Sequence, residues 1–291
     1  MPVRYRSSDE DSARWRDFAL RAGDIVVSTR SKHGTTWMQT MLLLLIHGPP
    51  PLPAPLGELS PWIDHVVEPA DDLFVRLAQQ VHRRVVKTHT PLDGVPIDSR
   101  ARYVVVARHP LDAAVSLYHQ GDNLDRDRLA QLTGTSAPPS RKPRPPLSDW
   151  LSDWIDHVAD PAEELDSLDG VLHHVKDAWS RRYDPNVVIV HYEDLRADLG
   201  AQMRALASFL DVAVAETQME ELVAAASFDS MRAQATQLAP DAHGVLRDAR
   251  AFFRRGSSGE GAASVSESAL ERYDRRVADL AAPDLIAWLH R

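Results

Sequence analysis

Residues 24–46, DIVVSTRSKHGTTWMQTMLLLLI, decide the fold that we expect for this chain. The first six, residues 24–29, predict a short buried strand, because three β-branched residues follow one another in the run IVV. Residues 36–46 predict a buried helix, because apolar residues occupy nearly every side of the helical pattern. Residues 30–35 connect the two. A buried strand followed at once by a buried helix is the opening unit of an α/β fold.

The connecting loop has the composition of an anion-binding site. Gly34 and the hydroxyl residues at the helix start leave backbone N–H groups free at the positive end of the helix dipole. Lys32 adds a full positive charge, and Thr35 and Thr36 add hydroxyl donors. Many α/β proteins open with a strand, a turn and a helix, so this loop alone leaves a purely structural role open.

The overall composition excludes several classes of protein. At 291 residues with 44% hydrophobic residues, the chain is long enough for one large α/β domain or two small ones. A net charge of −9 argues against a protein that coats nucleic acid, because that role needs a basic surface. The chain has no cysteine, which excludes disulfides, a thiol nucleophile and a cysteine-based zinc site.

The sequence shows no targeting or membrane segment. Its first residues, MPVRYRSSDEDSARWRDF, are charged and lack the apolar core of a signal peptide. The longest apolar run, residues 41–46, is far shorter than the ~20 residues that span a bilayer. We therefore expect a cytoplasmic protein.

Three further β-branched runs predict strands over residues 84–88, 102–107 and 187–191. Apolar periodicity predicts helices after Pro110 and over residues 9–21, 71–80, 150–158, 168–181, 200–210, 216–226, 267–281 and 284–291. Apolar strands that alternate with helices predict a parallel sheet flanked by helices on both faces. We expect one P-loop-like α/β domain over residues 1–291, with mobile loops at about 48–62, 121–148 and 250–265.

Charged and polar residues follow each of the first three predicted strands. Lys32 and Thr35 follow the first, Lys87 and His89 the second, and Arg108 the third. Because open α/β sheets bind ligands at the carboxyl ends of their strands, these side chains should meet in one place. Cations and hydroxyls with one histidine suit a substrate that has two separated anionic groups and one proton to be moved.

Six segments of the sequence resemble one enzyme family. In order along the chain they are SKHGTTW (31–37), VKTHTPL (86–92), VVVARHPLDAAVSLYH (104–119), HYEDL (191–195), SFDSM (227–231) and FFRRGSSG (252–259). With these six segments, the chain resembles the cytosolic-type sulfotransferases, which use 3′-phosphoadenosine 5′-phosphosulfate (PAPS) as the sulfuryl donor. The resemblance covers most of the chain and is closest in style to actinobacterial members, some of which act on glycolipids.

The resemblance implies a set of cofactor-binding residues. Around the 5′-phosphosulfate and the adenine they are Lys32, His33, Gly34, Thr35, Thr36, Trp37, Tyr192, Phe228 and Met231, with Trp37 packed on the adenine. At the 3′-phosphate they are Arg108, Ser116, Arg254, Arg255 and Gly256. Each of these residues could also have a purely structural role. Phe228 and Met231 have the spacing of core residues, and Tyr192 could be buried at the end of a strand. Arg254 and Arg255 could form a solvated basic patch.

The resemblance also implies the catalytic residues. His89 matches the general base, Lys87 the lysine beside it, and Lys32 the cation at the phosphosulfate. Sulfuryl transfer resembles phosphoryl transfer, so we expect positioning and electrostatics to do most of the work. A histidine pKa suits proton removal from a hydroxyl near neutral pH. No metal is expected, and the product nucleotide is 3′-phosphoadenosine 5′-phosphate (PAP).

The acceptor is the least determined part of the prediction. We expect a hydroxyl of a small organic or glycolipid acceptor, bound by Trp62, His65 and His89 with help from residues 133–150. The sequence departs from the family pattern in three places. His33 stands where serine is usual, Ala226 stands where many relatives have a hydroxyl residue, and Glu-Gly-Ala-Ala at 260–263 stands where the family continues with Asp-Trp. The lost tryptophan leaves open how firmly residues 250–261 close over the cofactor. No dimer motif is recognisable, so the oligomeric state is open.

Two other functions remain to be weighed. A P-loop small-molecule kinase would need the pattern Gly-x-x-x-x-Gly-Lys-Ser/Thr, which residues 29–36 lack, and a carboxylate for Mg²⁺. A non-catalytic nucleotide-binding protein would keep the cations but would not need His89.

Overall fold

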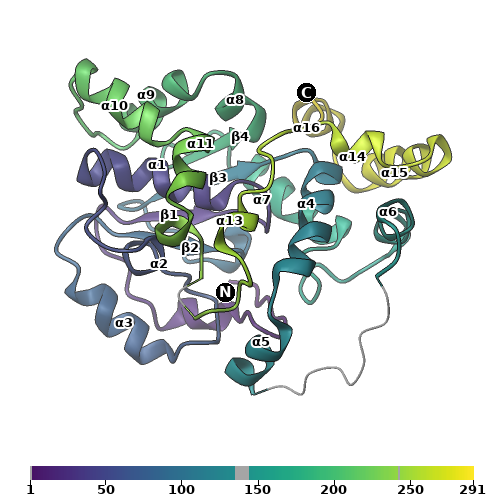
Figure 1. Ribbon diagram of the computed structural model, residues 1–291, viewed down its shortest axis with the longest axis horizontal. Helices are drawn as coiled ribbons and strands as arrows, with labels where there is room; N and C mark the ends of the chain where they lie inside the picture. The colour runs from purple at the N-terminus through teal and green to yellow at the C-terminus, as the bar shows by residue number, and fades with distance from the viewer. Residues whose placement is uncertain (1, 135–143, 242) are drawn as a thin grey trace.

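Four short parallel strands form the sheet on which the rest of the chain is built (Figure 1). The computed structural model describes residues 2–134, 144–241 and 243–291. The strands lie side by side in the order β2-β1-β3-β4, and all three pairings are parallel. Their bounds are β1 Ile25–Ser28, β2 Val85–Thr88, β3 Arg102–Ala107 and β4 Val187–His191. The predicted α/β fold with a parallel sheet is confirmed.

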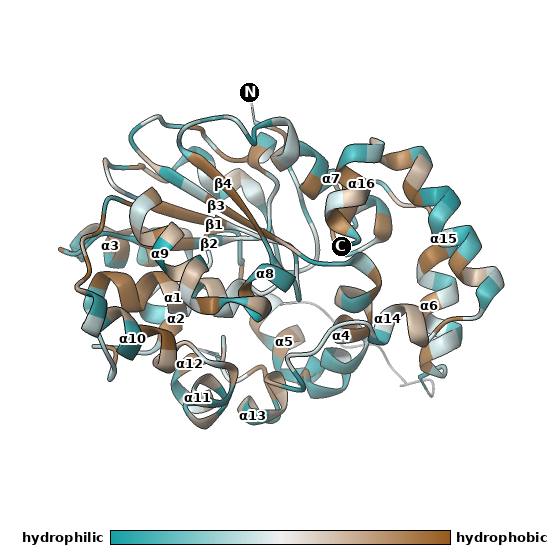
Figure 2. Cartoon of the chain, turned by 90° about the horizontal axis from the view of Figure 1, so that it is seen from above, coloured by the Kyte–Doolittle hydropathy of each residue, from teal (hydrophilic) through white to brown (hydrophobic). Residues whose placement is uncertain are grey.

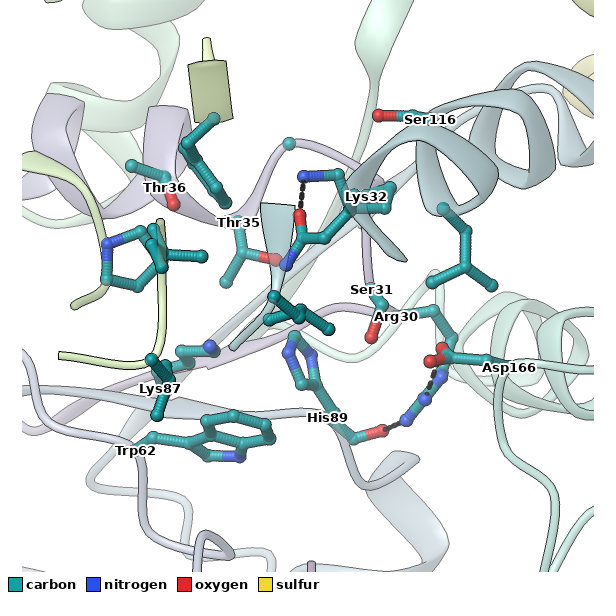
Figure 3. A pocket seen from close by; sticks show the side chains of 18 of the residues that line it. Arg30, Ser31, Lys32, Thr35, Thr36, Trp62, Lys87, His89, Ser116 and Asp166 are labelled. Carbon is teal, nitrogen blue, oxygen red and sulfur yellow. Dashed lines mark hydrogen bonds and ion pairs between the residues drawn. The ribbon is translucent and has the colours of Figure 1, made fainter. Parts of the chain in front are cut away.

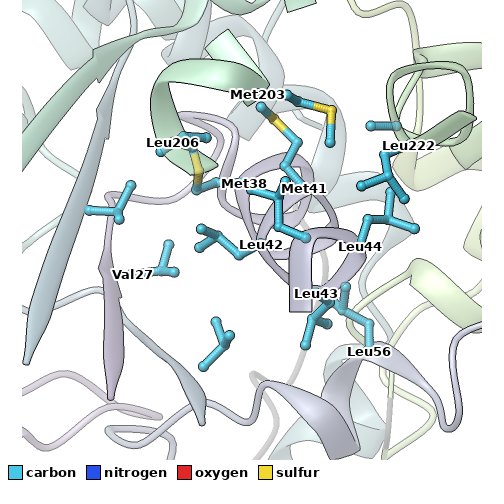
Figure 4. Close-up of a cluster of buried hydrophobic side chains, with 14 of the residues drawn as sticks. Val27, Met38, Met41, Leu42, Leu43, Leu44, Leu56, Met203, Leu206 and Leu222 are labelled. Carbon is cyan, nitrogen blue, oxygen red and sulfur yellow. The ribbon is translucent and has the colours of Figure 1, made fainter. Parts of the chain in front are cut away.

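One face of the sheet packs on a helix that is apolar almost all round. This helix, α1 (Thr35–His47), lies between Val27 of the sheet and the side chains of α9 (Leu199–Phe209) and α10 (Glu216–Ala225), as Figure 4 shows. Leu42 and Leu43 are fully buried there. Each fully buried leucine contributes roughly 1.5–3 kcal/mol relative to an exposed one, so this contact holds α1 against the sheet.

The opposite face of the sheet packs on a separate group of elements. The neighbouring strand residues point there, because successive side chains of a strand alternate between the two faces. Val26 and Tyr103 contact side chains from η1 (Ser12–Arg16), α3 (Ala70–Gln79) and α7 (Leu168–Ser180). Figure 2 shows apolar residues on both sides of the sheet. The sheet is therefore covered on both faces, as the apolar strands predict.

A second apolar cluster lies beside the sheet and supports the helix that follows β3. This helix, α4 (Pro110–Asn123), begins at Pro110, as predicted, because proline lacks the N–H that would be unpaired there. Leu111 and Val115 of α4 pack against several helices that lie together at one side of the sheet in Figure 2. These are α6 (Leu147–Asp156), α7, α15 (Glu267–Leu280) and α16 (Pro283–Leu289).

Several short helices differ from the sequence-based expectations. Residues 9–21 contain the 3₁₀ helix η1, which the side chain of Asp11 caps, instead of the expected α-helix. The motifs HYEDL and SFDSM each start a helix, capped by His191 and Ser227. The remaining helices are α2 (Leu56–Leu59), η2 (Leu92–Gly94), α5 (Arg126–Thr133), α8 (Tyr192–Ala197), α11 (Phe228–Ala233), α12 (Ala235–Leu238), α13 (Ala249–Phe252) and α14 (Glu260–Ala263).

The segments expected to be mobile loops contain some of these helices. Helices α2, α5 and α14 lie in residues 48–62, 121–148 and 250–265, respectively. Residues 135–143 of the predicted Pro-rich loop lie outside the described residues. The mobility of the three segments stays a prediction.

The strand order places a ligand-binding crevice next to β1. The chain passes from β1 to β2 on one side of it, and then to β3 on the other side. Loops at such a switch point diverge and leave a crevice at the carboxyl ends of the strands.

Among the helices of the described residues, none is both long and apolar enough to cross a bilayer.

Candidate active site

A cavity of about 970 Å³ opens at the carboxyl ends of the strands. It is lined by residues that follow each strand, so the predicted meeting of the strand-end side chains is observed. Of the predicted site residues, the cavity brings together Lys32, Gly34, Thr35, Thr36, Trp37, Trp62, His65, Lys87, His89, Arg108, Ser116, Tyr192, Phe228, Met231, Arg254, Arg255 and Gly256.

The loop between β1 and α1 has the backbone shape of an anion site. Lys32 and Gly34 both have positive φ angles, of 67° and 104°. Gly34 also lies against the ring of Tyr192, where an added Cβ would be 3.0 Å from Cδ2. Because Gly34 caps α1 without any side chain, the first N–H groups of the helix stay open toward the cavity.

His33 is the predicted cofactor residue that does not line the cavity. Its side chain is fully buried, its Nδ1 pairs with the carbonyl of Ser31 at 3.0 Å, and its Nε2 has no hydrogen-bond partner among the described residues. Its backbone N–H donates to the carbonyl of Arg30. Burial lowers the pKa of His33 to about 4. The expected direct contact of His33 with the cofactor is therefore not supported by the structure.

Lys32 is a partly buried cation that lies among other cations. Its ammonium donates to the side-chain oxygen of Gln120 and lies 4.1 Å from the ring centroid of Phe252 (Figure 3). Burial lowers its pKa to about 7, and the nearby charges of Arg108, Lys87 and Arg254 lower it further. An anion placed among these groups would favour the charged lysine again.

The protein fixes the ring of His89 through one of its two nitrogens, Nδ1. Its Nδ1 hydrogen bonds to the carbonyl of Thr29, and because a carbonyl can only accept, Nδ1 carries the proton. Nε2 is then the basic nitrogen of the neutral ring. Burial lowers the pKa of His89 well below its ordinary value, with Lys87 and Arg30 contributing. At neutral pH the ring is therefore uncharged and able to accept a proton.

Two residues that the sequence analysis missed fix the backbone of His89. Asp64 accepts from the N–H of His89 at 2.9 Å and from the indole of Trp15 at 2.6 Å. Arg30 donates to the carbonyl of His89 and, at 2.6 Å, to Asp166 (Figure 3). Arg30 stands in the quoted loop and Asp64 beside Trp62, but both are ordinary charged residues in the sequence, and no spacing rule marks them.

Trp62, His65 and Lys87 form one layered wall of the cavity. The ammonium of Lys87 lies 3.8 Å from the ring centroid of Trp62, and His65 stacks on the same ring at 4.3 Å. The ring of His89 meets Trp62 edge to face at 4.6 Å. Burial lowers the pKa of Lys87 to about 8 and that of His65 to about 3. Figure 3 shows Lys87 and His89 pointing into the same space.

Arg108 and Ser116 line the cavity from the β3–α4 region. The guanidinium of Arg108 donates to the carbonyl of Ser257 at 2.6 Å and lies 4.5 Å from the ring centroid of Tyr192. Ser116 lies on α4, about two helical turns after Arg108. Arg254 and Arg255 also line the cavity, but both form ion pairs with Glu260, at 2.6 and 3.3 Å.

The segment that lacks the family's tryptophan is held by Asp112 instead. The carboxylate of Asp112 accepts from the N–H groups of Gly259 and Gly261, each at 2.8 Å. Gly261 lies so close to α4 that an added Cβ would be 2.5 Å from the carbonyl carbon of Leu111. A side chain as large as tryptophan would not fit at position 261 in this packing, and the segment is fixed without it.

An aromatic group lines the part of the cavity next to α1. Trp37 and Tyr192 meet edge to face at 5.5 Å, and the indole N–H of Trp37 donates to the carbonyl of Ala226 at 2.9 Å. Phe228 and Met231 of α11 line the same cavity. This group offers flat apolar surfaces beside a set of cations, which suits a nucleotide base with its phosphates.

Comparisons with known proteins identify the family. The sulfotransferase domain family matches residues 22–282. The chain belongs to this family. A glycolipid sulfotransferase of Mycobacterium tuberculosis is 37% identical over 306 residues, which cover 99% of this chain and 94% of that protein. Human sulfotransferase 2B1 is 26% identical over 293 residues, which cover 94% of this chain and 70% of that protein.

Solved structures share the fold. A mouse sulfotransferase in complex with PAP superposes with a TM-score of 0.71 at 20% identity, covering 96% of this chain and 92% of that chain. Retinol dehydratase in complex with retinol and PAP superposes with a TM-score of 0.69 at 20% identity, covering 93% and 86%. The prediction of a PAPS-dependent sulfotransferase is confirmed, and the kinase alternative is not favoured.

No group of three or more histidine, aspartate or glutamate side chains is placed to hold a metal ion within residues 2–134, 144–241 and 243–291. The expected absence of a metal from the reaction stays a prediction, as do the cytoplasmic location and the role of each site residue.

Proposed function

We propose that this protein transfers the sulfuryl group of PAPS to a hydroxyl of a small organic or glycolipid acceptor, with His89 as the general base. The observation that carries the proposal is the cavity itself. It contains the cations Lys32 and Arg108 together with His89, whose Nε2 is free to accept a proton. The glycolipid acceptor is suggested by the M. tuberculosis relative, which is named for it.

The donor site that we propose combines the start of α1 with the region that follows β3. The open N–H groups of α1 and the hydroxyls of Thr35 and Thr36 hold the 5′-phosphosulfate. Arg108 and Ser116 hold the 3′-phosphate, and the aromatic group around Trp37 holds the adenine. PAPS supplies an activated sulfuryl group on a phosphate leaving group. Arg254 and Arg255 reach the 3′-phosphate only if their ion pairs with Glu260 rearrange.

The proposed chemistry uses two protein groups. His89 takes the acceptor's hydroxyl proton on Nε2, and the Thr29 carbonyl keeps the ring in the correct tautomer. Lys32 stabilises the negative charge that develops on the phosphate oxygen that leaves. Lys87 lies beside His89 in the same cavity and adds positive charge there. Trp62 and His65 form the wall against which the acceptor packs.

The test of the proposal is the His89→Ala variant in a transfer assay with radiolabelled PAPS across phenols, steroids and glycolipids. We expect turnover to fall by roughly 10² or more, because general base catalysis contributes about that much. Calorimetry should show unchanged PAP binding. His82→Ala, a change outside the cavity, is the matched control. Unchanged turnover in His89→Ala would remove His89 from the mechanism, and tighter binding of ATP-Mg than of PAP would favour the kinase.

A further inference from the structure

Glu10 is a buried carboxyl group in the cavity wall that the proposed reaction does not use. Its side chain is 8% exposed, and the cavity is lined by Glu10 together with Ser7 and Asp9 of the N-terminal segment. Within the described residues its Oε2 has no hydrogen-bond partner. The nearest cationic atom in an ion pair is Nη1 of Arg30, at 3.8 Å, which is beyond hydrogen-bond distance.

Glu10 lies next to the proposed base. The same Nη1 of Arg30 that is 3.8 Å from Glu10 donates to the backbone carbonyl of His89. The carboxyl group of Glu10 is therefore separated from the backbone of His89 by one guanidinium nitrogen. The backbone of Glu10 also forms a bridge with that of His65, which stacks on Trp62 in the wall assigned to the acceptor. Glu10 consequently belongs to the acceptor end of the cavity.

The chemistry of Glu10 selects a neutral hydroxyl as its partner. A buried polar atom without a partner costs stability, so a ligand that supplies a hydrogen bond there gains affinity. A phenol has one oxygen, which the reaction uses at His89, and would leave Glu10 against a carbon atom. An ammonium group is disfavoured because Arg30 and Lys87 already place positive charge around Glu10. Burial raises the pKa of Glu10 to about 8, so the group can both donate to and accept from a hydroxyl at neutral pH.

The other walls of the acceptor end fit the same ligand. Trp62, Trp150 and Trp154 line the cavity and offer flat apolar surfaces. The neighbouring acids Glu164 and Asp166 already have partners, His157 at 2.9 Å and Arg30 at 2.6 Å. Glu10 differs from these two acids in its burial: its side chain is 8% exposed, against 57% for Glu164 and 39% for Asp166, and its Oε2 has no hydrogen-bond partner within the described residues. Apolar faces with a few fixed polar atoms are the general composition of a specific small-molecule site.

We propose that Glu10 is the specificity-determining residue for the acceptor, and that it hydrogen bonds a second hydroxyl of a polyhydroxylated acceptor such as a sugar headgroup. This inference rests on the proposed sulfotransferase function. It predicts that the enzyme prefers a sugar hydroxyl to the hydroxyl of a phenol or of a simple alcohol.

The experiment compares Glu10→Leu and Glu10→Gln with the wild type on three acceptors: octyl β-D-glucoside, 1-octanol and 2-naphthol. The glucoside and the alcohol share the octyl chain and a primary hydroxyl, so they differ in the added hydroxyls. We expect Glu10→Leu to lower kcat/KM for the glucoside roughly 10- to 100-fold, the loss of one buried hydrogen bond to a substrate. We expect kcat/KM for 1-octanol and 2-naphthol to change less than threefold, roughly the scatter of such measurements. Glu10→Gln, which keeps the length and the hydrogen-bonding atoms, should stay within about fivefold of wild type on the glucoside.

The outcomes separate the two proposals. Equal losses on all three acceptors would show that Glu10 supports the fold or His89 and would overturn the specificity assignment. Transfer to 2-naphthol without transfer to the glucoside in the wild type would overturn it too and would leave the sulfotransferase function intact. No transfer to any acceptor, with PAP binding retained, would contradict the proposed function and this inference with it. PAP calorimetry on each variant confirms that the donor site is unchanged.

Discussion

Lys32→Arg is the substitution whose effect we can work out furthest. In the free protein, burial and the charges of Arg108, Lys87 and Arg254 lower the pKa of Lys32 to about 7. An anion in the cavity favours the protonated lysine, so the protein takes up a proton when it binds PAP above pH 7. Affinity should therefore fall as the pH rises through 7. Arginine stays charged over the whole range, so the variant lacks this contribution.

The magnitude follows from the fraction of charged lysine. With a pKa of about 7, half of the Lys32 side chains are charged at pH 7 and about 1% at pH 9. If only the charged form binds, the PAP dissociation constant rises about 50-fold between these two pH values. Lys87, with a pKa of about 8, adds its own pH dependence in both proteins.

The assay is PAP calorimetry at pH 7, 8 and 9 in two buffers of different ionisation enthalpy. The wild type should show the larger rise in dissociation constant, and its binding enthalpy should depend on the buffer because a proton is taken up. In Lys32→Arg both effects should be reduced by the contribution of one proton. Identical pH profiles and identical proton uptake in the two proteins would refute the assignment of Lys32 to the phosphate site.

Two further substitutions test the protein around the cavity. The pKa of His33 is about 4 in the folded protein and about 6.5 unfolded, so the unfolded state binds more protons between these values and stability falls as the pH drops from about 6.5 toward 4. Between pH 7 and pH 5, the unfolding free energy of His33→Ser should fall by about 2 kcal/mol less than that of the wild type, measured by urea unfolding. Parallel plots of unfolding free energy against pH for the two proteins would contradict this. Asp112→Ala removes the acceptor of two N–H groups in the segment that contains Arg254. It should weaken PAP binding roughly tenfold, and Asp112→Asn should have an intermediate effect. A calorimetric isotherm identical to that of the wild type would show that the segment closes without Asp112.

The strands and long helices were predictable because their signals are local. Residues 102–107 contain one tyrosine and three consecutive valines, and β3 has the same bounds. The short helices α8 and α11 were missed because each is a single capped turn or two, too short for a periodic pattern. The order β2-β1-β3-β4 depends on contacts between distant segments, which no local pattern records.

The motif residues of the site were predicted, but the residues that support them were not. His33 was placed at the cofactor by its position in the motif, yet it is turned into the core next to Lys32, whose backbone has a positive φ of 67°. Asp64 and Arg30 act on His89 through its backbone atoms, and Glu10 comes near His89 only through Arg30. Such contacts arise from tertiary packing, and a charged residue in a loop gives no sign of them in the sequence.

The central claim is that one nucleotide spans the cavity from Lys32 to Arg108, with His89 at the acceptor side. The most direct measurement is a crystal structure of this protein with PAP bound. We expect the 5′-phosphate to contact Lys32 and the N-terminus of α1, and the 3′-phosphate to contact Arg108 and Ser116, with Nε2 of His89 open to the remaining space. A nucleotide bound elsewhere, or one whose two phosphates leave Lys32 or Arg108 without contact, would contradict the account.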